Sequence, residues 1–213
     1  MLATLYYVHD PMCSWCYAFK PILDSIKTKL SKEINLVYVC GGLAKHTDEV
    51  MPKDQQEKIK SIWKQIEQEI GTKFNYDFWE KNTPQRATYL ACQALILARQ
   101  HDKEEAMLEA IQKAYYQKAL NPSKIEVLVK LAHEIGLDKK HFETHLNTEQ
   151  TQQLLEEDLD LRRKLGVRVF PTLLLKYKKE SYPIGINFKD STKMLEQIED
   201  LSKTPTFKIL EAK

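Results

Sequence analysis

The segment Cys13-Ser14-Trp15-Cys16 constrains the fold of this chain more than any other, because of what stands on either side of it. Residues 2–8 before it are rich in Leu, Tyr and Val, a composition typical of a strand. Apolar residues after it recur at helical spacing as far as Leu30. The two cysteines are therefore predicted at a strand-to-helix turn. Free N–H groups and the positive end of the helix dipole stabilise a thiolate there, and the thiolate is the reactive form of cysteine.

Three interpretations of the cysteine pair are open: redox chemistry, half of a zinc site, and inert thiols. His141 and His145 form a His-x3-His pattern, but they lie far beyond the spacing of a compact zinc finger from Cys16. A Cys-x-x-Cys segment at a strand-to-helix turn is more typical of redox chemistry. We therefore expect Cys13 to be the attacking nucleophile, Cys16 to be the resolving thiol, and no metal to be bound.

The composition limits the classes of partner. The 213 residues include 32 basic and 30 acidic side chains, mixed along the chain without a basic stripe, so we expect no nucleic-acid binding. Residues 1–20 lack the features of a signal peptide, and no apolar stretch is long enough to span a bilayer. We therefore expect a cytoplasmic protein without membrane association. Nothing in the sequence indicates a particular oligomeric state.

The order of the predicted elements divides the chain into three parts. A strand, a helix and a strand come first, a long series of amphipathic helices follows, and a hairpin with a final helix comes last. The expected strands cover residues 2–8, 34–39, 169–177 and 182–186. The expected helices cover residues 14–30, 53–70, 85–100, 104–118, 123–136, a short stretch from 138, 148–165 and 191–201. Gly71 is expected to end the second helix, and the tail after Thr204 is expected to be loose.

Polar residues predict where several of these helices begin. Ser123 and Glu126 form a capping-box pattern, in which each side chain bonds a free backbone N–H group of the first turn. Asp138, Thr148 and Ser191 each stand where an N-cap residue is expected.

Together these features resemble a known family, the DsbA-type thiol–disulfide oxidoreductases. The resemblance rests on the Cys-x-x-Cys segment at a strand-to-helix turn and on the segment Gly166-Val167-Arg168-Val169-Phe170-Pro171-Thr172 before a late strand. Within the family, residues 10–17 are most similar to the FrnE-like branch, which is itself similar to kappa-class glutathione transferases and 2-hydroxychromene-2-carboxylate isomerases. The resemblance implies an α/β fold with a thioredoxin-like core at residues 1–43 and 166–213. An all-helical domain at residues 44–165 is then inserted into that core.

The resemblance also assigns roles to individual residues. Cys13 and Cys16 are the implied catalytic pair, and Trp15 is expected to shield the sulfurs or contact a bound peptide. Pro171 is expected to follow a cis peptide bond beside the cysteines, and Phe170 to offer its backbone groups to the substrate. These five residues are the predicted site.

One position departs from the family pattern. Where relatives often bury an acid on the first strand as a proton relay, this chain has Tyr7. Asp10 is closer to the cysteines, but an Asp before Pro is typical of a turn. Cys40 and Cys92 stand in apolar surroundings and are interpreted as buried thiols without a redox role. Pro21 is expected inside the helix that follows the cysteines.

The sequence thus predicts a thiol–disulfide oxidoreductase that exchanges disulfides with protein or small-molecule substrates. The dithiol is its own redox centre, so no bound cofactor is expected, and glutathione is a candidate co-substrate. The alternative is a glutathione-dependent transferase or isomerase of kappa-class type, in which a Ser commonly replaces the first Cys. A third hypothesis is a holdase or interaction module that binds partners between the two domains without turnover.

Overall fold

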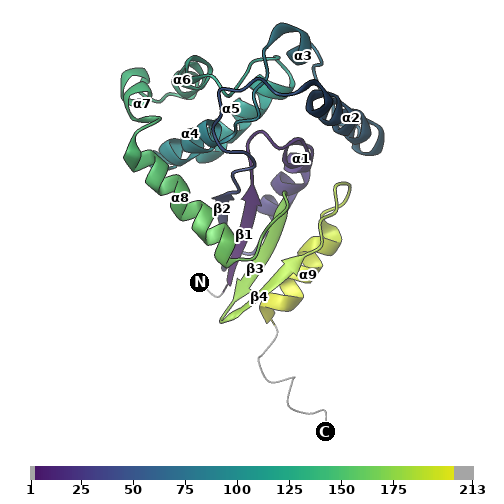
Figure 1. The fold of residues 1–213 in the computed structure, drawn as a ribbon. Coiled ribbons are helices and arrows are strands. Elements are labelled where there is room, and N and C mark those ends of the chain that lie inside the picture. Colours follow the sequence, from purple (N-terminus) through teal and green to yellow (C-terminus); the bar gives the residue numbers. More distant parts are fainter. Residues whose placement is uncertain (1–2, 204–213) are drawn as a thin grey trace.

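The computed structural model describes residues 3–203, and its centre is a four-stranded sheet with helices around it (Figure 1). The strands are β1 (Ala3–His9), β2 (Ile34–Cys40), β3 (Thr172–Tyr177) and β4 (Glu180–Ile184), in the spatial order β2-β1-β3-β4. β1 pairs in parallel with β2 and antiparallel with β3, and β3 pairs antiparallel with β4. The expected α/β fold and late hairpin are thus confirmed.

Helix α1 (Ser14–Lys29) and helix α9 (Thr192–Lys203) pack on one face of this sheet. Phe19, Leu23 and Ile26 of α1 lie in one apolar cluster with Leu5 of β1 and Ile198 of α9. These α1 residues recur at helical spacing, whereas the inward residues of β1 alternate, so each element presents one apolar face to the other. The first strand is therefore central in the sheet and buried.

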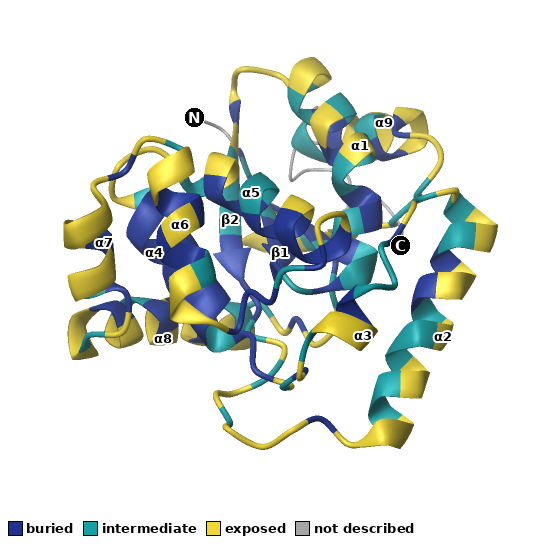
Figure 2. Ribbon diagram, turned by 90° about the horizontal axis from the view of Figure 1, so that it is seen from above, coloured by how far each residue is buried: buried dark blue, intermediate teal, exposed yellow. Residues whose placement is uncertain are grey.

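The helices between β2 and β3 form a group above the sheet, and the last of them runs down beside the strands (Figure 1). They are α2 (Lys53–Ile70), α3 (Phe78–Lys81), α4 (Tyr89–Arg99), α5 (Glu104–Tyr116), α6 (Ile125–Glu134), α7 (Lys139–His145) and α8 (Glu149–Lys164). Helix α4 is buried along almost its whole length and lies at the centre of the group, whereas one side of α2 is exposed (Figure 2). The division into a core at 1–43 and 166–213 and an insert at 44–165 remains a prediction.

Several predicted helix boundaries are confirmed. Helix α2 covers the expected residues and ends at Gly71, which has a positive φ of 85°. The side chain of Asp138 accepts a hydrogen bond from the backbone N–H of His141 at 2.6 Å, and Thr148 caps α8 in the same way. Pro21 lies inside α1, as expected.

Two predictions about the helical group are wrong. The helix expected from residue 85 begins only at Tyr89, because Gln85 forms an isolated β-bridge with Val50. The Ser123 hydroxyl donates to the carbonyl oxygen of Ala87 at 2.9 Å instead of capping α6. The N-cap of α6 is Lys124, and its side chain makes no capping hydrogen bond to the described residues.

The short helix α3 was absent from the predicted elements, since four residues are too few to show a helical period. The tail expected to be loose lies outside the described residues. Within residues 3–203, no helix combines the length and the apolar character that crossing a membrane requires.

Candidate active site around Cys13 and Cys16

Cys13 is the N-cap residue of α1, as the sequence predicts. Its backbone is extended, with φ −83° and ψ 117°, and its Sγ accepts a hydrogen bond from the backbone N–H of Cys16 at 3.4 Å. The sulfur therefore lies among the free N–H groups of the first helical turn, where a negative charge is stabilised. Cys13 is 7% exposed and Cys16 is 0% exposed, so the first sulfur is the more accessible of the two.

The segment that leads into β3 lies next to the turn that carries Cys13. The Phe170–Pro171 peptide bond is cis, as expected. The Cys13 Sγ lies 3.7 Å from the carbonyl oxygen of Phe170. The pairing of β1 with β3 explains this meeting, because Val8 at the end of β1 is opposite Thr172 at the start of β3.

A groove with a cavity volume of about 330 Å³ opens over Cys13. Trp15 lines it, and its ring packs on that of Phe188 at a centroid distance of 5.1 Å. Val169 is 71% exposed at the edge of the groove. The other lining residues come from the cysteine turn, from α2, from α5 and from loops, and they are Met12, Ser14, Leu43, Ile59, Ile62, Trp63, Arg86, Tyr115, Arg168 and Phe170. Of the predicted site residues, Cys13, Trp15 and Phe170 line the groove.

Cys16 lies beneath this groove, next to Tyr7. Burial raises the pKa of the Cys16 thiol, and a hydrogen bond and the charge of Cys13 act in the same direction. Burial likewise raises the pKa of Tyr7, and the neighbouring sulfurs of Cys16 and Cys13 add to the shift. The residue that replaces the expected acid is therefore a neutral phenol close to both sulfurs.

Asp10 makes more contacts beside the site than the turn that the sequence indicates. It does shape a turn, since its Oδ1 accepts a hydrogen bond from Met12 N at 2.8 Å. Its Oδ2 also accepts hydrogen bonds from Leu43 N and from the Thr88 hydroxyl, both at 2.7 Å. Burial raises the pKa of Asp10, and these hydrogen bonds oppose the shift. Its position directly after a buried strand was the available signal.

The other two cysteines lie behind Asp10 and are fully buried. The Cys92 Sγ is 3.6 Å from Asp10 Oδ2, and the Cys40 Sγ is 3.9 Å from the Cys92 carbonyl oxygen. Neither side chain lines the groove over Cys13. Their location agrees with the interpretation of buried thiols.

His9, at the end of β1, is a buried polar residue with an unusual environment. Neither of its ring nitrogens has a hydrogen-bond partner among the described residues. The ring stacks on Tyr7 at a centroid distance of 4.7 Å and an interplanar angle of 2°. Burial lowers the pKa of His9 to about 3, with a further contribution from the charge of Arg99. The imidazole is therefore held neutral.

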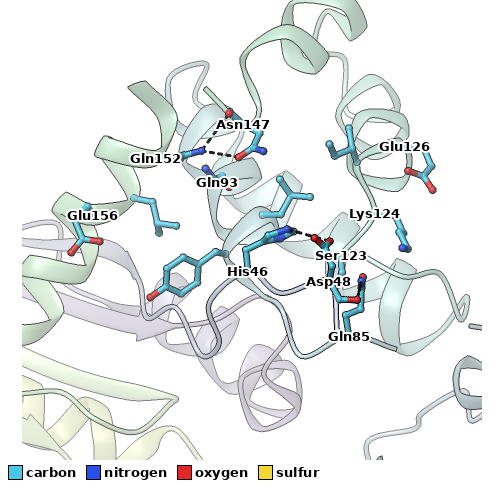
Figure 3. Close-up of a pocket in the computed structure, with 14 residues that line it drawn as sticks. His46, Asp48, Gln85, Gln93, Ser123, Lys124, Glu126, Asn147, Gln152 and Glu156 are labelled. Carbon is cyan, nitrogen blue, oxygen red and sulfur yellow. Dashed lines mark hydrogen bonds and ion pairs between the residues drawn. The ribbon is translucent and has the colours of Figure 1, made fainter. Parts of the chain in front are cut away.

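A larger cavity, of about 680 Å³, lies between α4, α6, α8 and the loop after β2 (Figure 3). His46 and Asp48 line it and form a pair at 3.5 Å, and Gln152 donates to the side chain of Asn147 at 3.0 Å. No cysteine of the described chain lines this cavity. Cys13 instead lines the smaller groove. Among residues 3–203, no three His, Cys, Asp or Glu side chains are grouped as metal ligands.

With this geometry established, comparison with known proteins identifies the family. The thioredoxin family model matches residues 6–198, a range that contains both Cys13 and Pro171. The chain belongs to the thioredoxin family. Within this family the fold is the DsbA-type variant, as the sequence predicts, whereas membership of the FrnE-like branch remains a prediction.

Two solved structures illustrate the shared thioredoxin fold. A candidate protein disulfide isomerase from Nitrosomonas europaea matches with a TM-score of 0.80 and 23% identity, over 94% of this chain and 97% of that one. The cytosolic disulfide reductase DsbM from Pseudomonas aeruginosa matches with a TM-score of 0.70 and 24% identity, over 93% of this chain and 95% of that one.

One curated relative that matches in sequence is the ClpXP adapter protein SpxH of Bacillus subtilis. It is 22% identical over 79% of this thioredoxin-family chain and 56% of its own length. The chain thus spans little more than half the length of this relative.

Proposed function

We propose that this protein is a thiol–disulfide oxidoreductase that works through the Cys13–Cys16 dithiol. The observation that carries the proposal is the position of the Cys13 sulfur. It caps a helix start, lines a groove and lies 3.7 Å from the Phe170 carbonyl oxygen. A substrate sulfur that enters this groove can reach Cys13, while Cys16 stays buried one helical turn inside.

The chemistry proceeds in two exchanges. The Cys13 thiolate attacks one sulfur of a substrate disulfide, the substrate S–S bond breaks, and the released thiolate takes up a proton. The Cys16 thiol then loses its proton and attacks the Cys13 sulfur of the mixed disulfide. The second substrate thiolate leaves, the substrate has gained two electrons, and the protein holds a Cys13–Cys16 disulfide. The reverse sequence oxidises a dithiol substrate.

The proposed partners are proteins, peptides or small molecules that carry thiols or disulfides. Glutathione is the proposed co-substrate that restores the dithiol, and the existence of a DsbM structure with GSH supports this choice. The cytosolic location of DsbM likewise supports a cytoplasmic location for this protein. No bound cofactor enters either exchange.

The relationship to SpxH favours a second candidate function, that of a protein adapter. An adapter would use the same fold to hold a partner and would need no disulfide turnover. The glutathione transferase alternative has less support, because Cys13 occupies the position at which that class commonly has Ser.

The deciding experiment is turnover of insulin disulfides with glutathione as the reductant. Wild-type protein is expected to reduce insulin faster than glutathione alone, and Cys13→Ser is expected to fall to the uncatalysed rate. Cys40→Ala is the matched control, since Cys40 is buried outside the groove, and it is expected to keep the wild-type rate. If the wild-type protein does not exceed the uncatalysed rate, the oxidoreductase proposal fails and the adapter function is favoured.

A further inference from the structure

We propose, as an extension that rests on the proposed function, that Arg86 and Arg168 select substrates with a carboxylate close to the reactive sulfur. Both arginines line the groove over Cys13, and they reach it from different parts of the chain. Arg86 belongs to the segment before α4, and Arg168 to the segment that leads to Pro171. They are the only charged residues, within the described chain, that line this groove.

Arg86 and Arg168 differ from the other three arginines in their hydrogen bonds and ion pairs. Arg99 bonds Glu104 and Asp158, Arg162 donates to the Gly41 carbonyl oxygen at 2.8 Å, and Arg163 pairs with acidic neighbours. Among residues 3–203, neither Arg86 nor Arg168 forms a hydrogen bond or an ion pair. The two arginines without such a partner are therefore the two that lie at the groove.

The walls of the groove strengthen the effect of these charges. Ile59, Ile62 and Trp63 of α2 provide an apolar surface, and a charge beside a surface of low polarizability attracts an opposite charge more strongly than it does in open water. A guanidinium also presents paired N–H donors that match the two oxygens of a carboxylate. The groove is therefore suited to a disulfide that combines apolar contact with negative charge.

Two kinds of substrate carry this chemistry. One is a small thiol or disulfide with its own carboxylates, and the other is a protein cysteine that has Asp or Glu beside it. Both place a carboxylate within a few bonds of the sulfur that Cys13 attacks, so the experiment contains an arm for each.

The first arm uses three model disulfides of similar size: dithiodipropionate, with two negative charges, bis(2-hydroxyethyl) disulfide, which is neutral, and cystamine, with two positive charges. The measured quantity is the ratio of kcat/KM between variant and wild type for each compound, because this ratio cancels intrinsic reactivity. Arg86→Gln and Arg168→Gln are each expected to lower kcat/KM for dithiodipropionate by about two- to fivefold. The neutral compound is expected to change much less, and cystamine to react faster.

The matched control is Lys179→Gln, which removes one positive charge from the exposed turn between β3 and β4, at the far end of β3 from Pro171. For this variant, the ratio of kcat/KM to that of wild type is expected to be one for each of the three model disulfides. Raising the salt concentration is expected to reduce the difference in kcat/KM for dithiodipropionate between wild type and the arginine variants, because salt screens exposed charges.

The second arm uses two peptide disulfides that differ only in having Asp or Lys beside the cysteine. Loss of Asp preference in the arginine variants identifies protein cysteines as substrates, whereas charge selection confined to the model compounds identifies small molecules. If the arginine variants lose the same fraction of kcat/KM for dithiodipropionate as for the neutral disulfide, or lose none for either compound, the proposed charge selection is wrong. A wild-type protein that turns over none of these disulfides would instead overturn the proposed function.

Discussion

The Cys13 sulfur lies 3.7 Å from the carbonyl oxygen of Phe170, although 157 positions separate the two residues in sequence. The contact depends on β1 and β3 being neighbours in the sheet, with the cysteine turn after one strand and Pro171 before the other. Both segments line the groove over Cys13.

Cys13 is expected to react first with an alkylating reagent. At pH 6, brief iodoacetamide treatment of the reduced protein should label Cys13, because the other three cysteines are completely buried. Peptide mapping by mass spectrometry measures the order of labelling. Earlier labelling of Cys16, Cys40 or Cys92 would contradict the assignment of the nucleophile.

Cys16→Ser is expected to trap substrates. Cys13 can still form a mixed disulfide in this variant, but no second thiol is placed to release the substrate. Adducts with cell-extract proteins or a model disulfide should accumulate on non-reducing gels and disappear on addition of dithiothreitol. Cys13→Ser is the matched control and should trap few or none. Equal trapping by both variants would refute the assigned roles.

Gly41→Ala is expected to disturb the site through Phe170. A Cβ atom at residue 41 would overlap the Phe170 ring, so the ring must move. The free energy of unfolding should fall by about 1–3 kcal/mol, as in other overpacked sites, and mixed-disulfide formation should slow. Gly185→Ala is the control, because a Cβ there meets nothing within 4 Å. Urea denaturation measures both variants, and equal stability of the two would contradict the prediction.

Protonation of His9 is expected to destabilise the fold in acid. Its pKa falls from the usual 6.5 to about 3 in the folded protein, so the unfolded chain binds the proton more readily. This contribution to stability is complete above pH 6.5 and is lost as the pH falls towards 3, at about 1.4 kcal/mol per pH unit. His9→Phe keeps a ring against Tyr7 and removes the titration. Urea denaturation at several pH values should show a shallower acid decline in the variant, and identical declines would contradict this account.

Asp10→Asn is expected to lower stability even though it removes a buried charge. Oδ1 and Oδ2 both accept hydrogen bonds, from Met12 N on one side and from Leu43 N and Thr88 on the other. An amide replaces one acceptor with a donor that faces another donor, which costs about 1–3 kcal/mol. Asp48→Asn is the exposed control. Thermal unfolding compares the two variants, and an unchanged midpoint for Asp10→Asn would show that its hydrogen bonds contribute little.

Much of the fold was predictable because local patterns and tertiary packing agree. Helix 53–70 has a continuous apolar face and a glycine at its end, and Asp138 stands directly before a helix with no competing partner. The cysteine pair was likewise placed correctly, since the strand before it and the helix after it both have clear periods.

The wrong predictions arise where a polar group forms a hydrogen bond with a residue distant in sequence instead of the local partner that the pattern predicts. Ser123 has a capping pattern, but the Ala87 carbonyl group accepts its hydroxyl proton instead. Asp10 looks like a simple turn residue because Thr88, which bonds its second oxygen, is 78 positions away. The same reason hides the groove, which joins residues from the cysteine turn, α2 and the segment before β3. The spacing of apolar residues along the sequence does not indicate which distant residues come into contact.

The central position of β1 has a consequence for the order of synthesis. A ribosome makes the chain from its N-terminus, so β1 and both site cysteines emerge before the helices and long before β3. Until residues 172–177 follow, β1 has an open edge and no Phe170 carbonyl lies over Cys13. At bacterial or eukaryotic elongation rates, this interval is on the order of ten seconds or more. A segment that is made early is thus among the last to be completed, and its thiols stay uncovered on one side in the meantime.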